Sequence, residues 1–365
     1  MPTCPIMLSL DGRSPDAENL LRVIQFQTPR WIPCNIGVLG STWKKYREDL
    51  EEVVLRNPRV FPGFKRGGKD YDQLVGAPNR ALGSLVDAWD CRWENIEEGL
   101  AGQVLGHPIE DWSALDSYQP PDLLEVDDWG APRDWDAVAR GLDAAEEHGG
   151  LRMGGGLHHG FMFMRLYYLR GFENLMLDIG SRDSRLDTLI EMVLEANWRV
   201  VERYLELGVE YMSFGDDLGN QVNLPISPAS WREYIGPCYE RLYSPCRDAG
   251  AHVYMHSDGD IKEIIPDLAS YGVTMVNPQI RANGLENLER ICKGKIAVAL
   301  DLDRQIFQFA TPDEIDAHIR EAVETLALPE GGLRVSAEVA QDVPLANIEA
   351  ICVAFEKYCL GDEAT

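Results

Sequence analysis

The sequence contains no long hydrophobic run. None of its apolar segments approaches the ~18 consecutive residues that a membrane-spanning helix needs. Residues 1–19 also lack the basic start and the apolar core of a signal peptide. We therefore expect a cytoplasmic protein that has no membrane partner.

Basic residues are also scarce in this chain. Its 34 Lys and Arg stand against 60 Asp and Glu, which gives a formal net charge of −26 at pH 7. Nucleic acids and anionic lipid surfaces are bound mainly through clusters of Lys and Arg. Because such an acidic chain is repelled by both, we expect no nucleic-acid partner. The charge does not by itself identify a substrate.

The eight cysteines form no CxxC pair and show no crowded, disulfide-type spacing. This usage is typical of a reducing compartment and agrees with a cytoplasmic location. With 45% hydrophobic residues in a length of 365, the chain can build a large core. We find no internal repeat, low-complexity tract or linker, and we expect a single domain over residues 1–365.

From residue 151 onward, short β-rich runs alternate with longer amphipathic stretches. This alternation is typical of βα units that build a parallel sheet. The helical stretches 184–208 and 227–250 each end on a glycine, which suits the end of a helix. Two earlier β-rich runs complete a set of eight predicted strands, namely 30–35, 83–89, 151–156, 211–215, 251–256, 273–277, 295–300 and 333–337.

Eight strands with intervening helices predict an α/β fold of the (β/α)8 TIM-barrel class, with an N-terminal helical extension. An open, doubly wound sheet is the alternative. Residues 90–150, which are rich in Trp, Gly and Pro, are expected to be an irregular insertion within the barrel domain.

Polar residues follow five consecutive predicted strands, at the ends where the active site of a parallel barrel lies. Taken singly, each has a structural explanation, because an Asp can organise a turn and a lone His can sit in a core. Their common position favours one shared cavity. The residues are Asp216 and Asp217, His256 and Asp258, Asn277 and Gln279, Asp301 and Asp303, and Glu338. His159, after the glycine run 154–156, is expected to line the same cavity.

A histidine among carboxylates can support two kinds of chemistry. It can hold Zn²⁺ or a similar ion through nitrogen and oxygen ligands, or it can act without a metal as part of a general acid and base pair. The residues alone leave both possibilities open.

The segment 215–279 resembles the uroporphyrinogen decarboxylase superfamily, which includes the corrinoid-dependent methyltransferases. The likeness rests on an Asp-rich turn, a strand end of the form G-x-x-V-x-x-H-S-x-G and an N-P-Q strand end, all in register. It continues through 300–315 and 343–351, and weakly into 166–179. The resemblance implies the (β/α)8 fold independently of the strand count.

The resemblance also separates two branches of the superfamily. Uroporphyrinogen decarboxylase itself carries an N-terminal Arg-rich motif, roughly R-Q-A-G-R, that helps to hold its tetrapyrrole. The corresponding residues 29–48 lack that motif, which argues against tetrapyrrole decarboxylation. Members of the methyltransferase branch exchange a methyl group between a small molecule and the cobalt of a corrinoid, a cobalamin-type cofactor. This chain has no D-x-H-x-x-G corrinoid motif, so the resemblance implies a separate corrinoid-carrying partner protein.

Thiol-methylating members of that branch bind zinc through H-x-C and a later Cys. Here His256 matches the histidine, whereas Asp258 and Glu338 stand at the two cysteine positions. The resemblance therefore implies a metal site formed by His256, Asp258 and Glu338, with zinc as a candidate ion. Such a site is harder than a thiolate site and suits an oxygen-bearing ligand.

These considerations predict the substrate-demethylating component of a corrinoid methyltransferase system, acting on a small O-methyl compound. The departing alkoxide or phenoxide needs a metal or an acid beside its oxygen. A methylated amine substrate, a decarboxylase or lyase acting on a small acid, and a non-catalytic ligand-binding barrel are the alternatives, and a homo-oligomer stays open. The predicted catalytic residues are His256, Asp216 and Asp217, and the predicted substrate-binding residues are Asn277, Gln279, Asp301 and His159.

Overall fold

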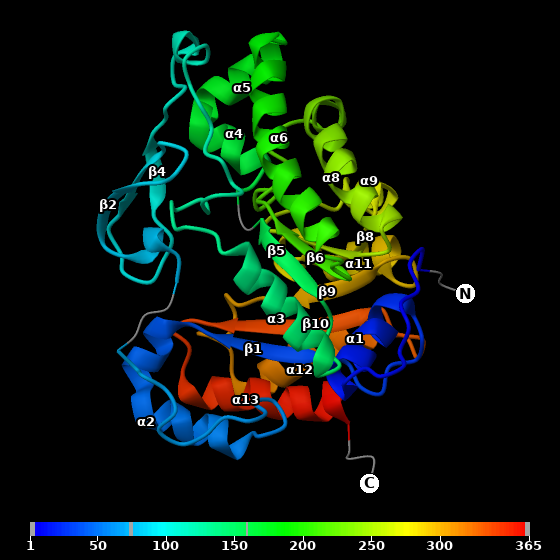
Figure 1. Ribbon diagram of the computed structural model, residues 1–365. Helices are drawn as coiled ribbons and strands as arrows, with labels where there is room; N and C mark the ends of the chain where they lie inside the picture. The colour runs from blue at the N-terminus through cyan, green and yellow to red at the C-terminus, as the bar shows by residue number, and fades with distance from the viewer. Residues whose placement is uncertain (1–3, 73–75, 158–159, 362–365) are drawn as a thin grey trace. The chain divides into compact units, whose positions relative to one another are not determined.

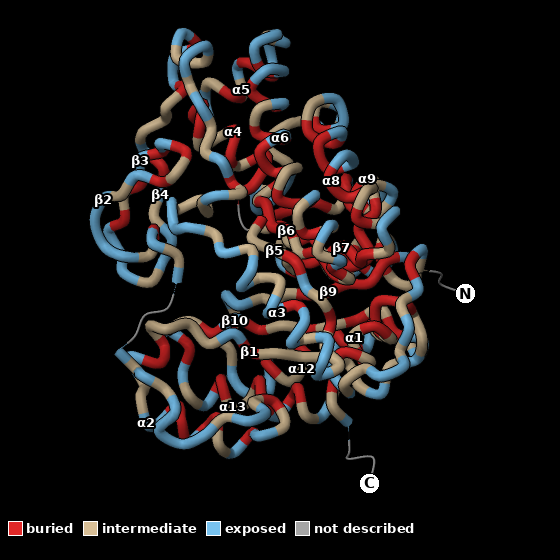
Figure 2. The backbone as a smooth tube through the Cα atoms, viewed as in Figure 1, coloured by how far each residue is buried: buried red, intermediate tan, exposed pale blue. Residues whose placement is uncertain are grey.

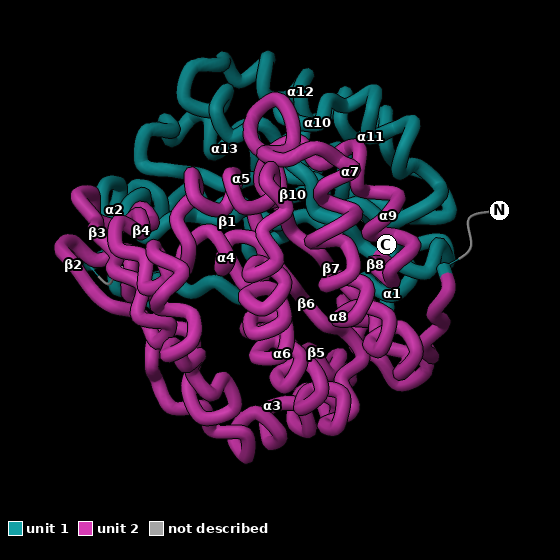
Figure 3. Tube along the Cα trace, turned by 90° about the horizontal axis from the view of Figure 1, so that it is seen from above, with its two compact units in different colours: residues 1–4, 18–76, 275–365 teal, residues 5–17, 77–274 magenta. Residues whose placement is uncertain are grey.

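The computed structural model describes residues 4–72, 76–157 and 160–361. Two units are distinguished in it (Figure 3). Unit 1 comprises residues 1–4, 18–76 and 275–365, and unit 2 comprises residues 5–17 and 77–274. Strand β8 (Val273–Pro278) begins in unit 2 and ends in unit 1.

In unit 1, the parallel strands follow the order β1, β10, β9 and β8 (Figure 1). Strand β1 spans Cys34–Val38, β10 spans Leu333–Val339 and β9 spans Ala297–Asp301. Gly37 lies opposite Glu338 in the register of β1 and β10. The helices are α1 (Pro15–Gln25, which begins in unit 2), α2 (Gly40–Arg56), α10 (Ile280–Asn283), α11 (Leu285–Cys292), α12 (Pro312–Leu326), α13 (Leu345–Phe355) and the π-helix η4 (Glu356–Leu360).

In unit 2, the parallel strands β5 (Met153–Leu157), β6 (Tyr211–Gly215) and β7 (His252–Ser257) lie side by side in that order. The start of β8 joins them, since the Val253 amide donates to Thr274 Oγ1 at 3.1 Å. The helices are α3 (Trp135–Glu147), α4 (Phe163–Arg170), α5 (Phe172–Ser181), α6 (Arg185–Glu206), α7 (Pro228–Ser230), the π-helix η3 (Trp231–Ile235), α8 (Gly236–Asp248), α9 (Ile265–Tyr271) and the 3₁₀ turns η1 (Pro78–Arg80) and η2 (Trp112–Ala114).

The central strands are buried along almost their whole length, as Figure 2 shows for β6 and β7. Strands of a parallel sheet that is covered on both faces need apolar residues at nearly every position. The helices instead bury one face. Helix α12 starts with a capping box between Thr311 and Glu314, and it buries Ile315, Ile319 and Val323 at helical spacing.

Most of the predicted elements are confirmed. The six predicted strands from 151 to 337 correspond to β5 to β10, and the run 30–35 leads into β1. The helical stretch 184–208 contains α6, and 227–250 contains α7, η3 and α8. Gly208 and Gly250, which follow these helices, have φ of +70° and +83°, the left-handed conformation that favours glycine.

The prediction that the run 83–89 is an eighth barrel strand is wrong. Within the described residues the parallel sheet has seven strands, and this run contributes β2 (Gly83–Val86) to a separate antiparallel sheet with β3 (Arg92–Asn95) and β4 (Gln103–Gly106). The reason is a tight turn in which the Asp87 amide donates to the Cys91 carbonyl. A parallel neighbour would need a crossover of about a dozen residues.

The region 90–150 contains β3, β4 and α3 as well as irregular segments. Its place as an insertion in a single domain over residues 1–365 stays a prediction. None of the helices in the described part of the chain combines the length and the apolar character needed to cross a bilayer.

Candidate active site

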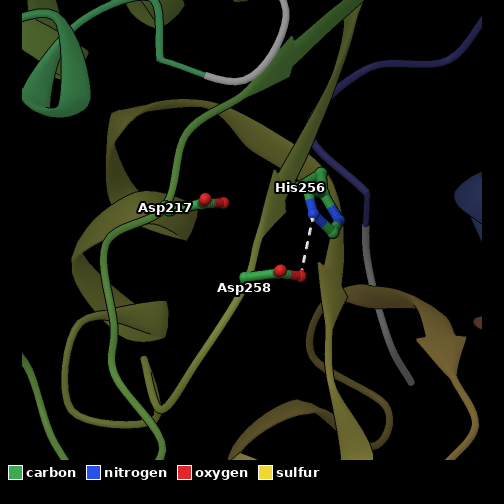
Figure 4. A group of neighbouring side chains, drawn as sticks. All are labelled: Asp217, His256 and Asp258. Carbon is green, nitrogen blue, oxygen red and sulfur yellow. Dashed lines mark ion pairs between the residues drawn. The ribbon is translucent and has the colours of Figure 1, made fainter. Parts of the chain in front are cut away.

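Three side chains from the ends of two neighbouring strands meet in unit 2 (Figure 4). Asp217 follows β6, His256 is the penultimate residue of β7, and Asp258 comes directly after β7. One ligand atom of each lies within 4.8 Å of the others, and His256 Nε2 is 3.3 Å from Asp258 Oδ1. The side chains of His256 and Asp258 are 15% and 37% exposed, so small molecules can reach them.

The loops that follow β6 and β7 are bonded to each other beside this cluster. The Leu218 amide donates to Ser257 Oγ at 3.0 Å, and the Asp260 amide donates to the Asn220 carbonyl at 2.7 Å. These two hydrogen bonds, which we call the clasp, hold the loop of Asp217 against the loop of Asp258.

Two glycines make the clasp possible. A Cβ on Gly259, which has φ of +79°, would stand 2.2 Å from the carbonyl carbon of Gly219. A Cβ on Gly219 would stand 2.5 Å from the Asp260 amide nitrogen. Since no side chain fits at either position, the two backbones can approach closely only with glycine. Gly259 therefore brings His256 and Asp258 close to Asp217.

Asp216 has different surroundings from Asp217. Its side chain is fully buried and accepts hydrogen bonds from the Phe163 amide at 2.6 Å, the Met164 amide at 3.1 Å and the Tyr239 hydroxyl at 2.7 Å. Burial raises the pKa of Asp216 to about 6, although these donors favour the charged form. The contacts make Asp216 an anchor for the start of α4, and its predicted catalytic role stays a prediction.

Helix α4 is held by a buried ionic network. Arg165 donates to Asp87 at 2.9 Å and to Asp128 at 3.1 Å, and its guanidinium lies over the Trp89 ring at 4.8 Å. Because Asp87 precedes β3 and Asp128 follows β4, this network connects the segment that contains these two strands to α4. Through Asp216, α4 is in turn connected to the loop that carries Asp217.

Tyr168 of α4 lies near the acidic cluster. Burial raises the pKa of its hydroxyl, and the negative charge of Asp217 raises it further. Its ring packs edge-on against Trp93 of β3, with 4.9 Å between the ring centroids. The Tyr168 ring therefore joins α4 to β3, and its hydroxyl is within the electrostatic influence of Asp217.

The predicted site residues Asn277, Gln279, Asp301 and Glu338 lie in unit 1. Asn277 is buried and donates to the Ala299 carbonyl at 2.5 Å, and Gln279 and Asp301 form an isolated parallel bridge. Ser336 donates to Asp301, and Arg304 forms an ion pair with Glu338. Asp303 pairs with Arg281 at 2.9 Å. The substrate and metal roles given to Asn277, Gln279, Asp301 and Glu338 stay predictions, and His159 lies outside the described residues.

Sequence reasoning missed the residues that support the site. Tyr239 lies inside helix α8, and its pattern there is that of an ordinary buried aromatic. Arg165 and Asp87 are 78 positions apart, so no local pattern links them. Asp217 was predicted as a catalytic group, whereas its place beside His256 and Asp258 adds it to the candidate metal ligands.

The three clustered side chains offer one imidazole nitrogen and several carboxylate oxygens. This donor set fits a divalent ion of borderline hardness such as Zn²⁺. Without a metal, the pair of His256 and Asp258 has the arrangement of a general acid whose charged form is stabilised by a neighbouring carboxylate.

The chain resembles one protein family and several solved structures. The family model of uroporphyrinogen decarboxylase (URO-D) matches residues 104–358. A solved methyltransferase from Methanosarcina mazei is similar over 94% of this chain and 98% of its own, with 18% sequence identity and a TM-score of 0.61. A D-psicose 3-epimerase solved with D-fructose is similar over 63% of this chain and 86% of its own, with 10% identity and a TM-score of 0.40. No functionally curated protein matches.

The likeness to the methyltransferase structure confirms the predicted α/β fold of the TIM-barrel class. Because the sequence identity is only 18%, this likeness shows the fold and not the activity.

Proposed function

Because the chain belongs to the uroporphyrinogen decarboxylase family, we propose that it is the substrate-demethylating component of a corrinoid-dependent methyltransferase system. In this reaction a methyl group leaves the oxygen of a small O-methyl compound. The cobalt of a corrinoid, carried by a separate protein, receives it. The superfamily resemblance that was noted in residues 215–279 is confirmed by the family match, which covers 104–358.

The observation that carries this proposal is the cluster of Asp217, His256 and Asp258 at the ends of two adjacent parallel strands. Active sites of TIM-barrel enzymes lie at these strand ends. Cleavage of an ether bond leaves negative charge on oxygen, and an imidazole between carboxylates can relieve that charge by giving a proton or by sharing a bound cation.

If a divalent metal is bound, its ligands would be Asp217, His256 and Asp258, with Glu338 as the predicted alternative for Asp217. Such an ion supplies Lewis-acid stabilisation to the oxygen of the leaving group. The three side chains would hold the ion beside the substrate, and the clasp of Gly219 and Gly259 would keep them from separating.

If no metal is bound, His256 would donate a proton to the leaving oxygen. Asp258, 3.3 Å from Nε2, would orient the ring and stabilise the imidazolium before the transfer. Asp217 from the neighbouring loop would orient the substrate. In both forms His256 is the central residue.

The test uses the purified chain with free, reduced cobalamin and a panel of methoxylated phenols. We expect spectral conversion of cobalamin to methylcobalamin, and His256→Ala should lower the rate by about 10²-fold or more. Asp248→Asn serves as the matched control, because Asp248 is an exposed acid that pairs with Arg247 and is not among the predicted site residues. No methyl transfer from any methoxylated compound, with release of CO₂ from small acids instead, would refute the proposal.

Metal content separates the two forms of the site. Zinc bound to the wild type but lost in both His256→Ala and Asp217→Asn, and kept in Glu338→Gln, would assign Asp217 as the third ligand. Loss in Glu338→Gln with retention in Asp217→Asn would instead support the ligand set predicted from the sequence.

A methylated amine is the second candidate substrate, and one observation favours it. The carboxylates of Asp217 and Asp258 lie close together at the cluster and provide a negative environment that attracts a cation. A panel that includes methylated amines beside the methoxylated compounds distinguishes the two substrate classes. A methylated amine reacts as a cation, and because it leaves as a neutral amine, its leaving group needs less stabilisation.

A further inference from the structure

A cavity lies between the loops that follow β6 and β7, farther along both loops than the clasp. It is lined by residues within 222–228 and 260–263 of unit 2, and the three cluster residues do not line it. Its volume is about 280 Å³, close to the lower end of the range for small-molecule sites in proteins. The cavity is therefore a candidate site for a small ligand that is separate from the cluster.

The first wall of the cavity is held in place by its own hydrogen bonds. Asn220 Oδ1 accepts from the Val222 amide at 2.9 Å and from the Asn223 amide at 3.0 Å. Ser227 Oγ accepts from the Ser230 amide at 3.0 Å and so caps α7. Because these bonds lie within the loop itself, a ligand would not have to order this wall when it binds.

Two hydrogen-bond donors belong to the lining, one from each loop. Asn223 Oδ1 accepts from Asn220 Nδ2 at 2.7 Å, and Asn223 Nδ2 has no partner among the described residues. Lys262 pairs with the carboxylate of Asp260, which is only 3% exposed. An ammonium group has three donors, so this pair leaves Lys262 able to bind a second acceptor. The lining thus offers an amide and an ammonium to one anionic group.

The charges of the lining favour an anion over a cation. Asp260 and Lys262 neutralise each other, and a cation that displaced Lys262 would have to separate a pair whose carboxylate is buried, which is costly. Glu263 is the other charged residue of the lining, but it is exposed, so solvent weakens its attraction for a cation. An anion instead meets two donors, with Glu263 as a weak opposing charge.

Most of the remaining lining is apolar. Its apolar residues are Val222, Leu224, Pro225, Ile226 and Pro228. Val222 is 74% exposed, which leaves most of a large apolar side chain in contact with water. An apolar ligand body that packs against it would remove this surface from water and so add hydrophobic stabilisation.

We propose that this cavity binds a small carboxylate whose other end is apolar, the class that includes simple aromatic acids. The carboxylate would accept hydrogen bonds from Lys262 Nζ and Asn223 Nδ2, and the ring would pack against the apolar wall of residues 222–228. No bond is made or broken there, so the site goes beyond the proposed methyl transfer. Because the ligand would touch both loops that the clasp joins, its binding should stabilise the folded protein.

The experiment is isothermal titration calorimetry of the full chain with benzoate, benzylamine and benzyl alcohol. These probes share one ring and differ in the charge of the group attached to it. We expect benzoate to bind with a Kd of about 10⁻³–10⁻⁵ M, and the other two probes to bind at least about tenfold more weakly.

Variants of the lining sharpen the test. Asn223→Asp keeps the acceptor that Asn220 bonds and replaces the donor by a negative charge, so it should weaken benzoate binding by about tenfold or more. Glu263→Gln removes the opposing charge and should tighten binding by about two- to fivefold. Asp248→Asn, at an exposed acid that does not line the cavity, is the control and should bind benzoate like the wild type.

His256→Ala separates this cavity from the cluster. The variant should lose methyl transfer and keep benzoate binding, because His256 does not line the cavity. Failure of the proposed function and failure of the proposed carboxylate site can therefore be told apart. Undetectable binding of benzoate, equal binding of benzylamine, loss of benzoate binding in His256→Ala, or wild-type binding in Asn223→Asp would each overturn the carboxylate site.

Discussion

His252 makes the stability of this protein depend on pH in a defined way. It is the first residue of β7 and is fully buried. Neither of its ring nitrogens has a hydrogen-bond partner within the described part of the chain. Burial lowers its pKa from 6.5 to about 4, against a smaller opposing influence from Glu210. The imidazole is therefore neutral in the folded protein, because its charged form cannot be solvated there.

The direction of the effect follows from the two pKa values. As the pH falls below 6.5, His252 takes up a proton in the unfolded chain but stays neutral in the folded one, so protons favour unfolding. The loss ends near pH 4, where the folded state is protonated as well. The pKa falls by 6.5 minus 4, or 2.5 units, and at ~1.4 kcal/mol per unit this lowers the free energy of unfolding by about 3–4 kcal/mol.

The assay is urea unfolding at several pH values between 7 and 4, for the wild type and for His252→Leu, which keeps the volume and removes the titration. The difference in unfolding free energy between the two should shift by about 3–4 kcal/mol toward the variant as the pH falls. His148→Gln, at an exposed position, is the control and should follow the wild type. A constant difference between wild type and His252→Leu across this range would refute the reasoning.

Two further predictions concern the supports of the site. Gly259→Ala should separate the two loops and reduce both methyl transfer and stability. The control is Gly250→Ala, where the glycine also has a left-handed φ but a Cβ would meet no atom within 4 Å, so it should lower the free energy of unfolding by only about 1–2 kcal/mol. Equal effects of the two variants on activity would contradict the clasp. Arg165→Met should lower the free energy of unfolding by about 3–5 kcal/mol, because it leaves Asp87 and Asp128 without their cation. The exposed pair of Arg140 and Asp134 provides the control, and Arg140→Met should unfold like the wild type.

Local patterns were sufficient to predict most of the fold. The apolar runs of β6 to β10 are bounded by turn residues, and the glycines after α6 and α8 mark helix ends that the structure confirms. The run 83–89 has the same β-rich composition as a barrel strand. It pairs with β3 instead, because Asp87 accepts hydrogen bonds from the Trp89 and Cys91 amides and closes a tight turn. Counting β-rich runs along the sequence does not reveal such a turn.

The same limit applies to the candidate site. The motif of His256, Asp258 and Gly259 could be predicted because its residues are neighbours in the sequence. Its position at the active-site end of the sheet follows from the parallel arrangement of the strands. The approach of Asp217 depends on a contact between two glycine backbones that are 40 residues apart. Similarly, the ion pair of Arg165 with Asp87 joins helix α4 to the turn that follows β2, so only the three-dimensional structure reveals it.

The adjacent residues Asp216 and Asp217 have chemically different tasks, and a pH profile can separate them. Asp216 accepts backbone hydrogen bonds at the start of α4, and burial raises its pKa to about 6. When the pH falls below that value, the protonated carboxyl accepts these bonds less well, and the loop that carries Asp217 loses part of its support. Methyl transfer by the wild type should therefore decline below about pH 6, whereas Asp216→Asn should be slower at neutral pH and lack this decline. If Asp216→Asn keeps the decline at the same pH, the titrating group is another one, and Asp216 acts only by its packing.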